Sequence, residues 1–214
     1  MNNSTFHRIE ASRVIAILRG NLRGHERVLA DALHAGGLTA LEVTLNSPDA
    51  FGVIERLLHH AGDRMAIGAG TVLQPDEVER VAAIGGQFIV SPNRDVRVIA
   101  RTKELGLLSF PGCYTPSEVV EATQAGADAV KLFPATMLGV NYVKALRGPL
   151  PDIRYVPTGG VTPELAREYV LAGAWAVGVG SELIAREFFQ AADVSNALSK
   201  IQARAAAYRE ALIA

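Results

Sequence analysis

Several residue types are scarce in this chain of 214 residues, and each scarcity excludes a class of protein. Cys113 is the only cysteine, which excludes an internal disulfide and agrees with a reducing compartment. The formal net charge is -1 and the basic residues are dispersed, so no basic patch could neutralise a nucleic-acid backbone. Residues 1–13 are polar, and no apolar run is long enough for a signal peptide or a membrane span. We therefore expect a cytoplasmic protein with no membrane or nucleic-acid partner.

Histidine is absent beyond residue 60, and the five histidines before that point match no familiar spacing of metal ligands. We expect surface histidines and no metal site. Without a nearby histidine to activate it, Cys113 is predicted to be a core or pocket-wall residue rather than a nucleophile. The segment Arg19-Gly20-Asn21 after the first predicted strand is not a G-x-G-x-x-G turn, so nothing indicates a dinucleotide. We expect a small-molecule substrate and no cofactor.

A repeated unit is present from about Val14 onward: an amphipathic helical stretch, a break that usually contains glycine, and a short apolar run. The breaks stand in HAGGLTALEVTL, AAIGGQFIVS, KELGLLSF, QAGADAVKLF and LAGAWAVGVG, where glycine can end a helix in the left-handed conformation. The pattern predicts alternating strands and helices, with a last helix over Val194–Leu212. The predicted strands are Val14–Leu18, Ala40–Leu45, Met65–Gly68, Phe88–Ser91, Leu107–Phe110, Ala129–Phe133, Tyr155–Pro157 and Ala176–Val179.

These strands are apolar on both faces, so both faces of the sheet must be covered and the strands should run parallel. Eight roughly even units favour a compact (β/α)8 TIM barrel over an open, doubly wound sheet, which is the alternative α/β fold. No linker or low-complexity tract divides the chain, and we expect a single domain over residues 1–214. In such a barrel the functional site lies at the C-terminal ends of the strands.

Lysine is rare, and one of the four lysines stands apart from the others. Lys103, Lys144 and Lys200 lie in polar helical stretches and are predicted to be on the surface, whereas Lys131 interrupts the apolar strand in ADAVKLFP. Burial lowers the pKa of an amine and increases the neutral fraction that can attack a carbonyl group. Lys131 is therefore either a nucleophile or a core lysine that pairs with a carboxylate.

Glu42 presents the same choice, because it lies between Leu41 and Val43 in the apolar stretch TALEVTL. Burial would raise its pKa toward the range that suits an acid–base group. An ion pair between Glu42 and Lys131 across the barrel is the structural alternative.

Glycine-rich loops follow three of the predicted strands. Gly159-Gly160 and Gly180-Ser181 follow the last two strands, where many barrels bind a phosphate through backbone N–H groups, although tight turns would give the same pattern. Gly70-Thr71 offers a hydroxyl that could anchor a carboxylate, or a simple turn before a helix. Arg19 and Pro111 also stand at strand ends.

Taken in order, these motifs resemble the family of 2-keto-3-deoxy-6-phosphogluconate aldolases, which includes 4-hydroxy-2-oxoglutarate and 2-keto-3-deoxy-6-phosphogalactonate aldolases. The likeness extends over nearly the whole chain, through IAILRG, ALEVTLNSP, IGAGTVL, FIVSPN, FPGCYTPSE, AVKLFPAT, VKALRGPLP, VPTGGVTPE and VGVGSELI. The resemblance implies a compact (β/α)8 barrel, commonly a homotrimer, with Lys131 as the Schiff-base lysine and Glu42 as the acid–base group. It also implies that substrate is bound by Arg19, Gly70, Thr71, Pro111, Phe133, Thr158, Gly159, Gly160, Gly180 and Ser181.

The position after the EVTL motif departs from the family pattern. Many phosphogluconate aldolases carry an arginine there, whereas this chain has Asn46, and Arg19 is the candidate replacement for that cation. IAILRG and LNSP resemble the phosphogalactonate branch, while Thr158 in PTGG resembles the phosphogluconate branch. The resemblance therefore leaves open the configuration of the substrate at C4.

The function implied is class I aldol cleavage of a phosphorylated 2-keto-3-deoxy sugar acid to pyruvate and glyceraldehyde 3-phosphate, with 4-hydroxy-2-oxoglutarate as a further candidate substrate. Two alternatives remain: a metal-free phosphosugar isomerase or epimerase, and a non-catalytic barrel that binds a phosphorylated metabolite. Lys131 discriminates among them, because only the aldolase needs a covalent amine nucleophile.

Overall fold

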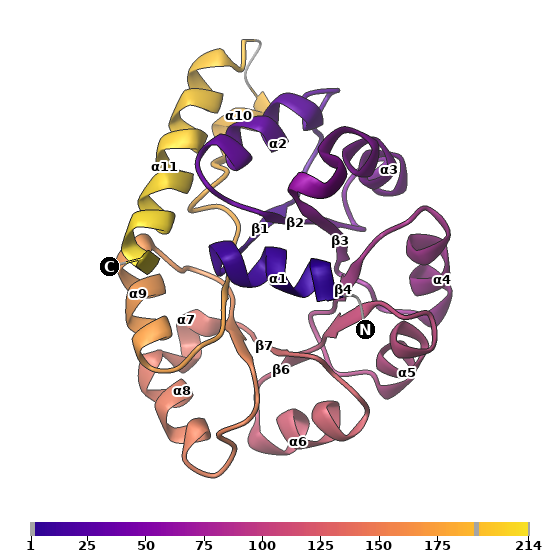
Figure 1. The fold of residues 1–214 in the computed structure, drawn as a ribbon, viewed down its shortest axis with the longest axis vertical. Helices are drawn as coiled ribbons and strands as arrows, with labels where there is room; N and C mark the ends of the chain where they lie inside the picture. Colours follow the sequence, from indigo (N-terminus) through magenta and orange to yellow (C-terminus); the bar gives the residue numbers. More distant parts are fainter. Residues whose placement is uncertain (1–2, 191–192, 214) are drawn as a thin grey trace.

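The computed structural model describes residues 3–190 and 193–213, and it is an α/β fold built on parallel strands (Figure 1). One curled sheet has the order β5-β4-β3-β2-β1-β9, a second has the order β6-β7-β8, and every strand pair is parallel. The strands are β1 (Val14–Leu18), β2 (Ala40–Thr44), β3 (Ala66–Gly70), β4 (Phe88–Val90), β5 (Leu108–Phe110), β6 (Gly112–Cys113), β7 (Val130–Leu132), β8 (Tyr155–Pro157) and β9 (Val177–Val179).

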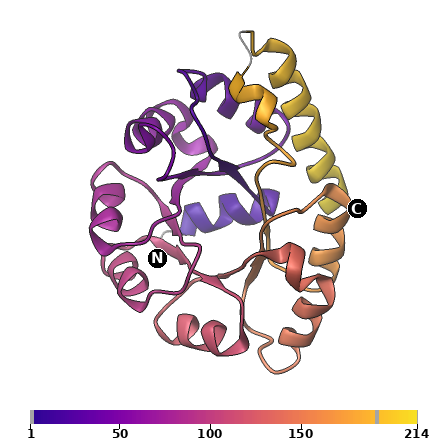
Figure 2. The ribbon, with the colours of Figure 1, turned by 180° about the vertical axis from the view of Figure 1, so that it is seen from behind.

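Helices connect the strands and cover the outside of both sheets (Figures 1 and 2). They are α1 (Asn3–Ser12), α2 (Glu26–Ala35), α3 (Ala50–Ala61), α4 (Pro75–Ala83), α5 (Val96–Glu104), α6 (Pro116–Gln124), α7 (Ala135–Leu138), α8 (Val140–Arg147), α9 (Pro163–Leu171), α10 (Arg186–Gln190) and α11 (Ser195–Ile213), with a short 3-10 helix, η1, at Gly62–Arg64. Within the described residues, no helix is long and apolar enough to cross a membrane.

The eight predicted strands are all present, and the differences are at their ends. The third strand, β3, begins at Ala66 and continues to Gly70, two residues beyond its predicted end. An additional short strand, β6, follows β5 directly after Pro111. The last helix was predicted over Val194–Leu212 and lies at Ser195–Ile213. Apolar periodicity locates an element well, whereas its last residues depend on local hydrogen bonds that the pattern does not contain.

Backbone hydrogen bonds also join the two sheets at both of their edges. On one side the N–H groups of Asp128 and Lys131 donate to the carbonyls of Ser109 and Pro111, at 3.0 and 2.9 Å. On the other side Thr158 forms a parallel bridge with Gly178. The β5–β6 segment therefore lies beside β7, and β8 lies beside β9.

Helix α1 covers the N-terminal ends of the strands. Figure 1 shows it across the middle of the molecule in front of the strands, and Figure 2, from behind, shows it beyond them. Phe6 of α1 stacks on Trp175 with ring centroids 4.5 Å apart. Inside the fold, the ring of Trp175 contacts that of Phe110, which in turn contacts Phe88. This end of the interior is therefore filled with apolar side chains, which leaves the C-terminal ends for a site.

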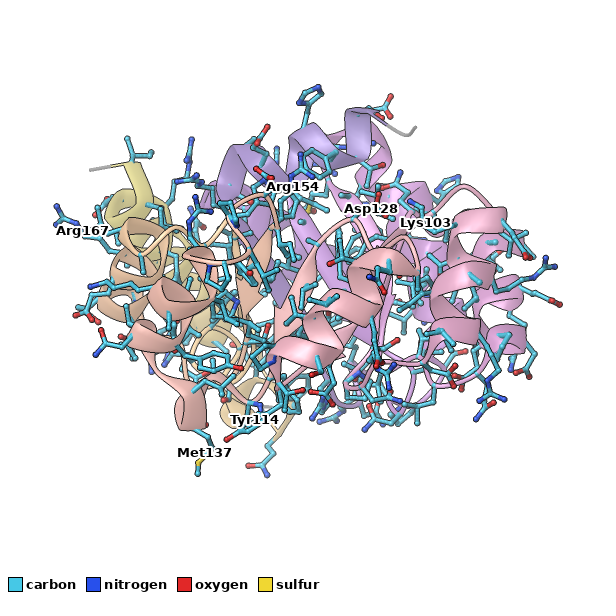
Figure 3. The ribbon with its side chains drawn as sticks, turned by 90° about the horizontal axis from the view of Figure 1, so that it is seen from below. Lys103, Tyr114, Asp128, Met137, Arg154 and Arg167 are labelled. Carbon is cyan, nitrogen blue, oxygen red and sulfur yellow. The ribbon has the colours of Figure 1, made fainter. Side chains whose placement is uncertain are left out.

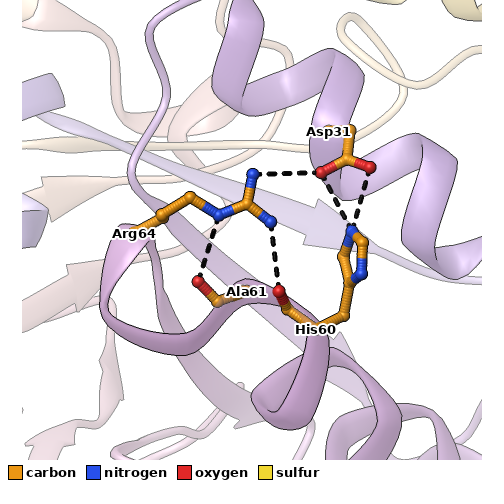
Figure 4. A network of polar contacts seen from close by, with 4 residues as sticks. All are labelled: Asp31, His60, Ala61 and Arg64. Carbon is orange, nitrogen blue, oxygen red and sulfur yellow. Dashed lines mark hydrogen bonds and ion pairs between the residues drawn. The ribbon is translucent and has the colours of Figure 1, made fainter.

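Two side-chain clusters correct predictions made from the sequence. Lys103 is only partly exposed, because its ammonium group pairs with Asp128 at 2.6 Å (Figure 3). Among the predicted surface histidines, His25, His34 and His60 are partly buried. His60 contacts both carboxylate oxygens of Asp31 at 2.9 Å, and Arg64 donates to the same carboxylate (Figure 4). Polar residues at these helix ends tie neighbouring elements together, which a single-helix pattern does not reveal.

We expect Gly68→Ala to destabilise the fold. A β-carbon at residue 68 would lie 2.5 Å from Cγ of Phe88 and would also meet the backbone carbonyl of that residue, which cannot move aside. Overpacking of this kind lowers the free energy of unfolding by roughly 1–3 kcal/mol. Gly148→Ala is the matched control, because its backbone is right-handed and its new β-carbon would make an ordinary 3.5 Å contact. Equal urea-unfolding curves for the two variants would contradict the packing argument.

Candidate active site

Lys131 and Glu42 both point into the interior enclosed by the curled sheets. In β2, Leu41 and Val43 pack in the outer core beneath the helices, so Glu42 takes the opposite, inner face. The same alternation in β7 places Lys131 on the inner face, between two residues that pack outward. The residues are 2% and 6% exposed, respectively. Each residue is exceptional in the sequence because it is a charged residue within an apolar strand. Its position in that strand is also what buries it.

Burial shifts the pKa of both groups toward the neutral form. Burial is the main cause that lowers the pKa of Lys131; Glu42 opposes that shift, and the nearby Arg19 adds to it. Burial likewise raises the pKa of Glu42, against the opposing charges of Lys131 and Arg19. None of the ion pairs among the described residues joins Lys131 to Glu42 within 4.0 Å. The two groups thus influence one another's charge without the direct pair that was the structural alternative.

The last residue of β3 makes room for the glutamate. A β-carbon at Gly70 would lie 2.5 Å from Oε1 of Glu42, so only glycine leaves space for that carboxylate. Thr71 follows with a φ of +60°, a left-handed conformation that a β-branched residue rarely adopts. Such conformations persist where the surroundings enforce them, often at ligand sites. This backbone feature of Thr71 was not visible in the sequence.

A cavity of about 320 Å³ opens at the C-terminal ends of β1, β7, β8 and β9. Eight of the predicted site residues line it: Arg19, Lys131, Phe133, Thr158, Gly159, Gly160, Gly180 and Ser181. Glu42, Gly70 and Thr71 lie beyond its lining, next to one another as the Gly70 contact shows. Pro111 is buried, and its carbonyl accepts the backbone N–H of Lys131. Pro111 is therefore linked to Lys131 by a backbone hydrogen bond.

Close packing explains the glycines of β9 and of the loop after β8. Gly159 and Gly160 have φ values of +102° and +64°, and a β-carbon at Gly160 would collide with Thr136. A β-carbon at Gly178 would collide with the side chain of Thr158, whose hydroxyl donates to the carbonyl of Val156 at 3.1 Å. Gly159, Gly160 and Gly180 line the cavity without side chains, so the backbone of the loops after β8 and β9 is open to it, as a bound anion would require.

Four further residues line the cavity that sequence reasoning did not select: Ile17, Glu182, Ile184 and Phe189. Ser181 donates a hydrogen bond from its hydroxyl to Oε2 of Glu182 at 3.2 Å. Glu182 directly follows a residue that the sequence placed at a strand end, so a wider window around Ser181 would have found it. Phe189 comes from α10, and no sequence signal connects that helix with the site.

Two further residues that the sequence singled out, Asn46 and Cys113, do not line the cavity. Asn46, which follows the EVTL motif, is exposed. Cys113 is a buried core residue, and burial raises the pKa of its thiol to about 12, so the thiolate that a nucleophile requires is scarce. Among residues 3–190 and 193–213, no three histidine, cysteine or acidic side chains come together as a metal site.

The fold and this cavity, with one buried lysine on its wall, agree with what comparison to known proteins shows. A sequence model of the family "KDPG and KHG aldolase" matches residues 6–201. The 2-dehydro-3-deoxy-6-phosphogalactonate aldolase of Escherichia coli strain K12 is 39% identical over 200 residues, covering 93% of this chain and 96% of that protein. The chain therefore belongs to the KDPG and KHG aldolase family. It is an aldolase, which is a carbon–carbon lyase.

Solved structures give the same result. A structure described as native KDPGal has a TM-score of 0.84 and 37% identity, covering 92% of this chain and 93% of that one. The KDPG aldolase of Legionella pneumophila, captured with pyruvate as a covalent carbinolamine intermediate, has a TM-score of 0.81 and 31% identity, covering 94% of this chain and 96% of that one.

The lowered pKa of Lys131 predicts a pH profile for its chemical reactivity. Competitive labelling with trace acetic anhydride, followed by peptide mapping, should give Lys131 a midpoint below the ordinary lysine value of 10.5. Arg19→Gln removes a cation that lowers this pKa and should move the midpoint up. Glu42→Gln removes an anion that raises it and should move the midpoint down. Shifts in the same direction for both variants would contradict the charge arrangement.

Proposed function

We propose that Lys131 is the Schiff-base nucleophile of this aldolase and that the cavity beside it binds a phosphorylated 2-keto-3-deoxy sugar acid. The observation that carries the proposal is the position of the Lys131 amine, buried on the cavity wall with its pKa lowered. A larger neutral fraction gives an amine its nucleophilicity toward a ketone. The products would be pyruvate and glyceraldehyde 3-phosphate.

The reaction follows from the two buried groups. The neutral amine of Lys131 attacks the C2 ketone to give a carbinolamine, and loss of water leaves an iminium ion. Glu42, directly or through one water, relays the protons of this step and then takes the proton of the C4 hydroxyl. As the C3–C4 bond breaks, its electron pair moves into the iminium and forms an enamine. The enamine takes a proton at C3, and hydrolysis releases pyruvate and the free amine.

The other site residues would form two groups, one for each charged end of the substrate. Arg19, Thr71 and the backbone at Gly70 would orient the carboxylate of the keto acid near Lys131. The backbone N–H groups of the Gly159-Gly160 and Gly180-Ser181 loops would bind the phosphate, since bare backbone on both loops faces the cavity. Pro111, Phe133 and Thr158 would shape the space between the ends.

We also propose that the two sheets form one closed (β/α)8 barrel over a single domain, supported by the hydrogen bonds that join them at both edges. The helices would then form its outer ring. A homotrimer would be the working assembly, and it would cover part of the exposed apolar surface, such as Leu171, which is 76% exposed. A cytoplasmic location agrees with a free, buried cysteine.

A pyruvate trap tests the nucleophile. Pyruvate with borohydride should give a reduced adduct, found by intact mass and peptide mapping on Lys131 and on no other lysine. Lys131→Ala should abolish both the adduct and aldol cleavage while the far-ultraviolet circular dichroism stays unchanged. Lys103→Ala is the control, because that amine pairs with Asp128 away from the cavity. A folded Lys131→Ala enzyme with substantial cleavage activity would refute the assignment, and turnover without any adduct would favour the isomerase or epimerase alternative.

Substrate choice is a separate test. The 2-dehydro-3-deoxy-6-phosphogalactonate aldolase of Escherichia coli is 39% identical to this chain, whereas three 2-dehydro-3-deoxy-phosphogluconate aldolases are 33%, 37% and 35% identical. We therefore expect kcat/KM for 2-keto-3-deoxy-6-phosphogalactonate to exceed that for its C4 epimer, the phosphogluconate, in a coupled assay of pyruvate release. Weaker activity on 4-hydroxy-2-oxoglutarate is expected, because that substrate lacks the phosphate. A preference for the phosphogluconate would reverse this part of the proposal.

A further inference from the structure

Helix α10 carries two adjacent phenylalanines with different surroundings. Phe188 is 3% exposed, and its ring faces His25 of the loop before α2 at a centroid distance of 6.5 Å. Phe189 packs edge-on against Phe188, with centroids 5.4 Å apart, and lines the cavity that contains Lys131. The buried Phe188 therefore anchors a second ring at the wall of the site.

The ring of Phe189 lies on the loop that follows β1. Gly20 has a φ of +137°, and a β-carbon there would lie 3.0 Å from Cδ1 of Phe189 and meet no other residue as closely. On another side of this loop, the N–H of Gly20 donates to Oγ of Ser47 at 3.1 Å, and Ser47 contacts the hydroxyl of Thr44 at 3.0 Å. Thr44 ends β2, the strand that carries Glu42. The loop is thus held both by the end of β2 and by Phe189.

Arg19 depends on this support, because its side chain is exposed and none of the hydrogen bonds or ion pairs among the described residues involves it. The backbone of the Arg19-Gly20 loop is therefore what places the base of this side chain beside the cavity. From that position its charge acts on both Lys131 and Glu42. A loop without the Phe189 contact would let this cation move away from the site.

We propose that Phe189 is a positioning residue for substrate binding: it holds the Arg19-Gly20 loop against the cavity and so keeps the Arg19 cation where the keto-acid carboxylate binds. This inference rests on the proposed function for the identity of the ligand, but the contact between Phe189 and the Arg19 loop is independent of it. Losing an ionic hydrogen bond to substrate typically weakens binding about 10-fold or more. The effect should appear mainly in KM, because Phe189 itself takes no part in the chemical step and acts on Lys131 only through the Arg19 charge.

Phe189→Ala should raise KM for the phosphorylated keto acid by roughly 10-fold and lower kcat by a smaller factor, through the raised pKa of Lys131. Phe189→Leu, which keeps an apolar side chain over Gly20, should recover most of the loss. Phe51→Ala is the matched control: it removes a partly buried ring of α3 that lies under Arg80 and outside the cavity, and it should leave KM unchanged. Thermal unfolding of each variant separates lost binding from lost fold.

Two readouts distinguish positioning of Arg19 from a general packing role. Phe189→Ala should move the acetylation midpoint of Lys131 up, in the direction expected for Arg19→Gln and by no more than that variant does. Combined with Arg19→Gln, it should raise KM no further, because both changes remove the same interaction. The inference would be overturned if the two single-variant effects on KM multiplied in the double variant. It would also be overturned if the Lys131 midpoint of Phe189→Ala equalled that of the wild type. If wild-type protein forms no pyruvate adduct, the proposed function fails, whereas the acetylation midpoints still test the contact.

Discussion

The burial of Lys131 and Glu42 on the inner face of the sheets is the constraint on which the other features of the site depend. An ionised group removed from water is destabilising unless it is paired and hydrogen-bonded, and these two groups share no direct ion pair. Each therefore shifts toward its neutral form, and the shift in the lysine is what its proposed chemistry needs. A pair in contact would stabilise both charges and remove the free amine. The fold thus accepts a local loss of stability at the place where reactivity is required.

Small residues around the pair make this arrangement possible. Gly70 leaves room for the carboxylate of Glu42, and Gly68 leaves room for the ring of Phe88 beneath it. In β9, Gly178 leaves room for the Thr158 side chain, and in the loop after β8, Gly160 leaves room for Thr136. A β-carbon at Gly68 would meet backbone as well as the ring, and one at the other three positions would displace the side chain of Glu42, Thr158 or Thr136. The glycines therefore act mainly through the space that they leave rather than through flexibility.

Much of this could be predicted from the sequence, and the failures have physical reasons. The eight strands, the buried lysine and the buried glutamate follow from apolar runs interrupted by single charges, because strand periodicity assigns each side chain to a face. Residues whose position depends on contacts between distant segments could not be predicted. Phe189 comes from a short helix that meets the Gly20 loop only in the folded chain, and the pairing of Lys103 with Asp128 joins α5 to the loop before β7. The left-handed backbone of Thr71 could not be predicted, because no neighbouring side chain in the sequence indicates it.

Helix α1 and the aromatic side chains behind it determine from which side a substrate can reach Lys131. Phe6, Trp175, Phe110 and Phe88 fill the N-terminal end of the interior, so whatever reaches Lys131 enters and leaves through the opposite face, where Tyr114 and Met137 project in Figure 3. In the proposed reaction, the fragment attached to Lys131 would lie at the inner end of this path, and the phosphorylated aldehyde would lie between it and solvent. The aldehyde would then depart first in cleavage, and pyruvate would bind before the aldehyde in the reverse reaction.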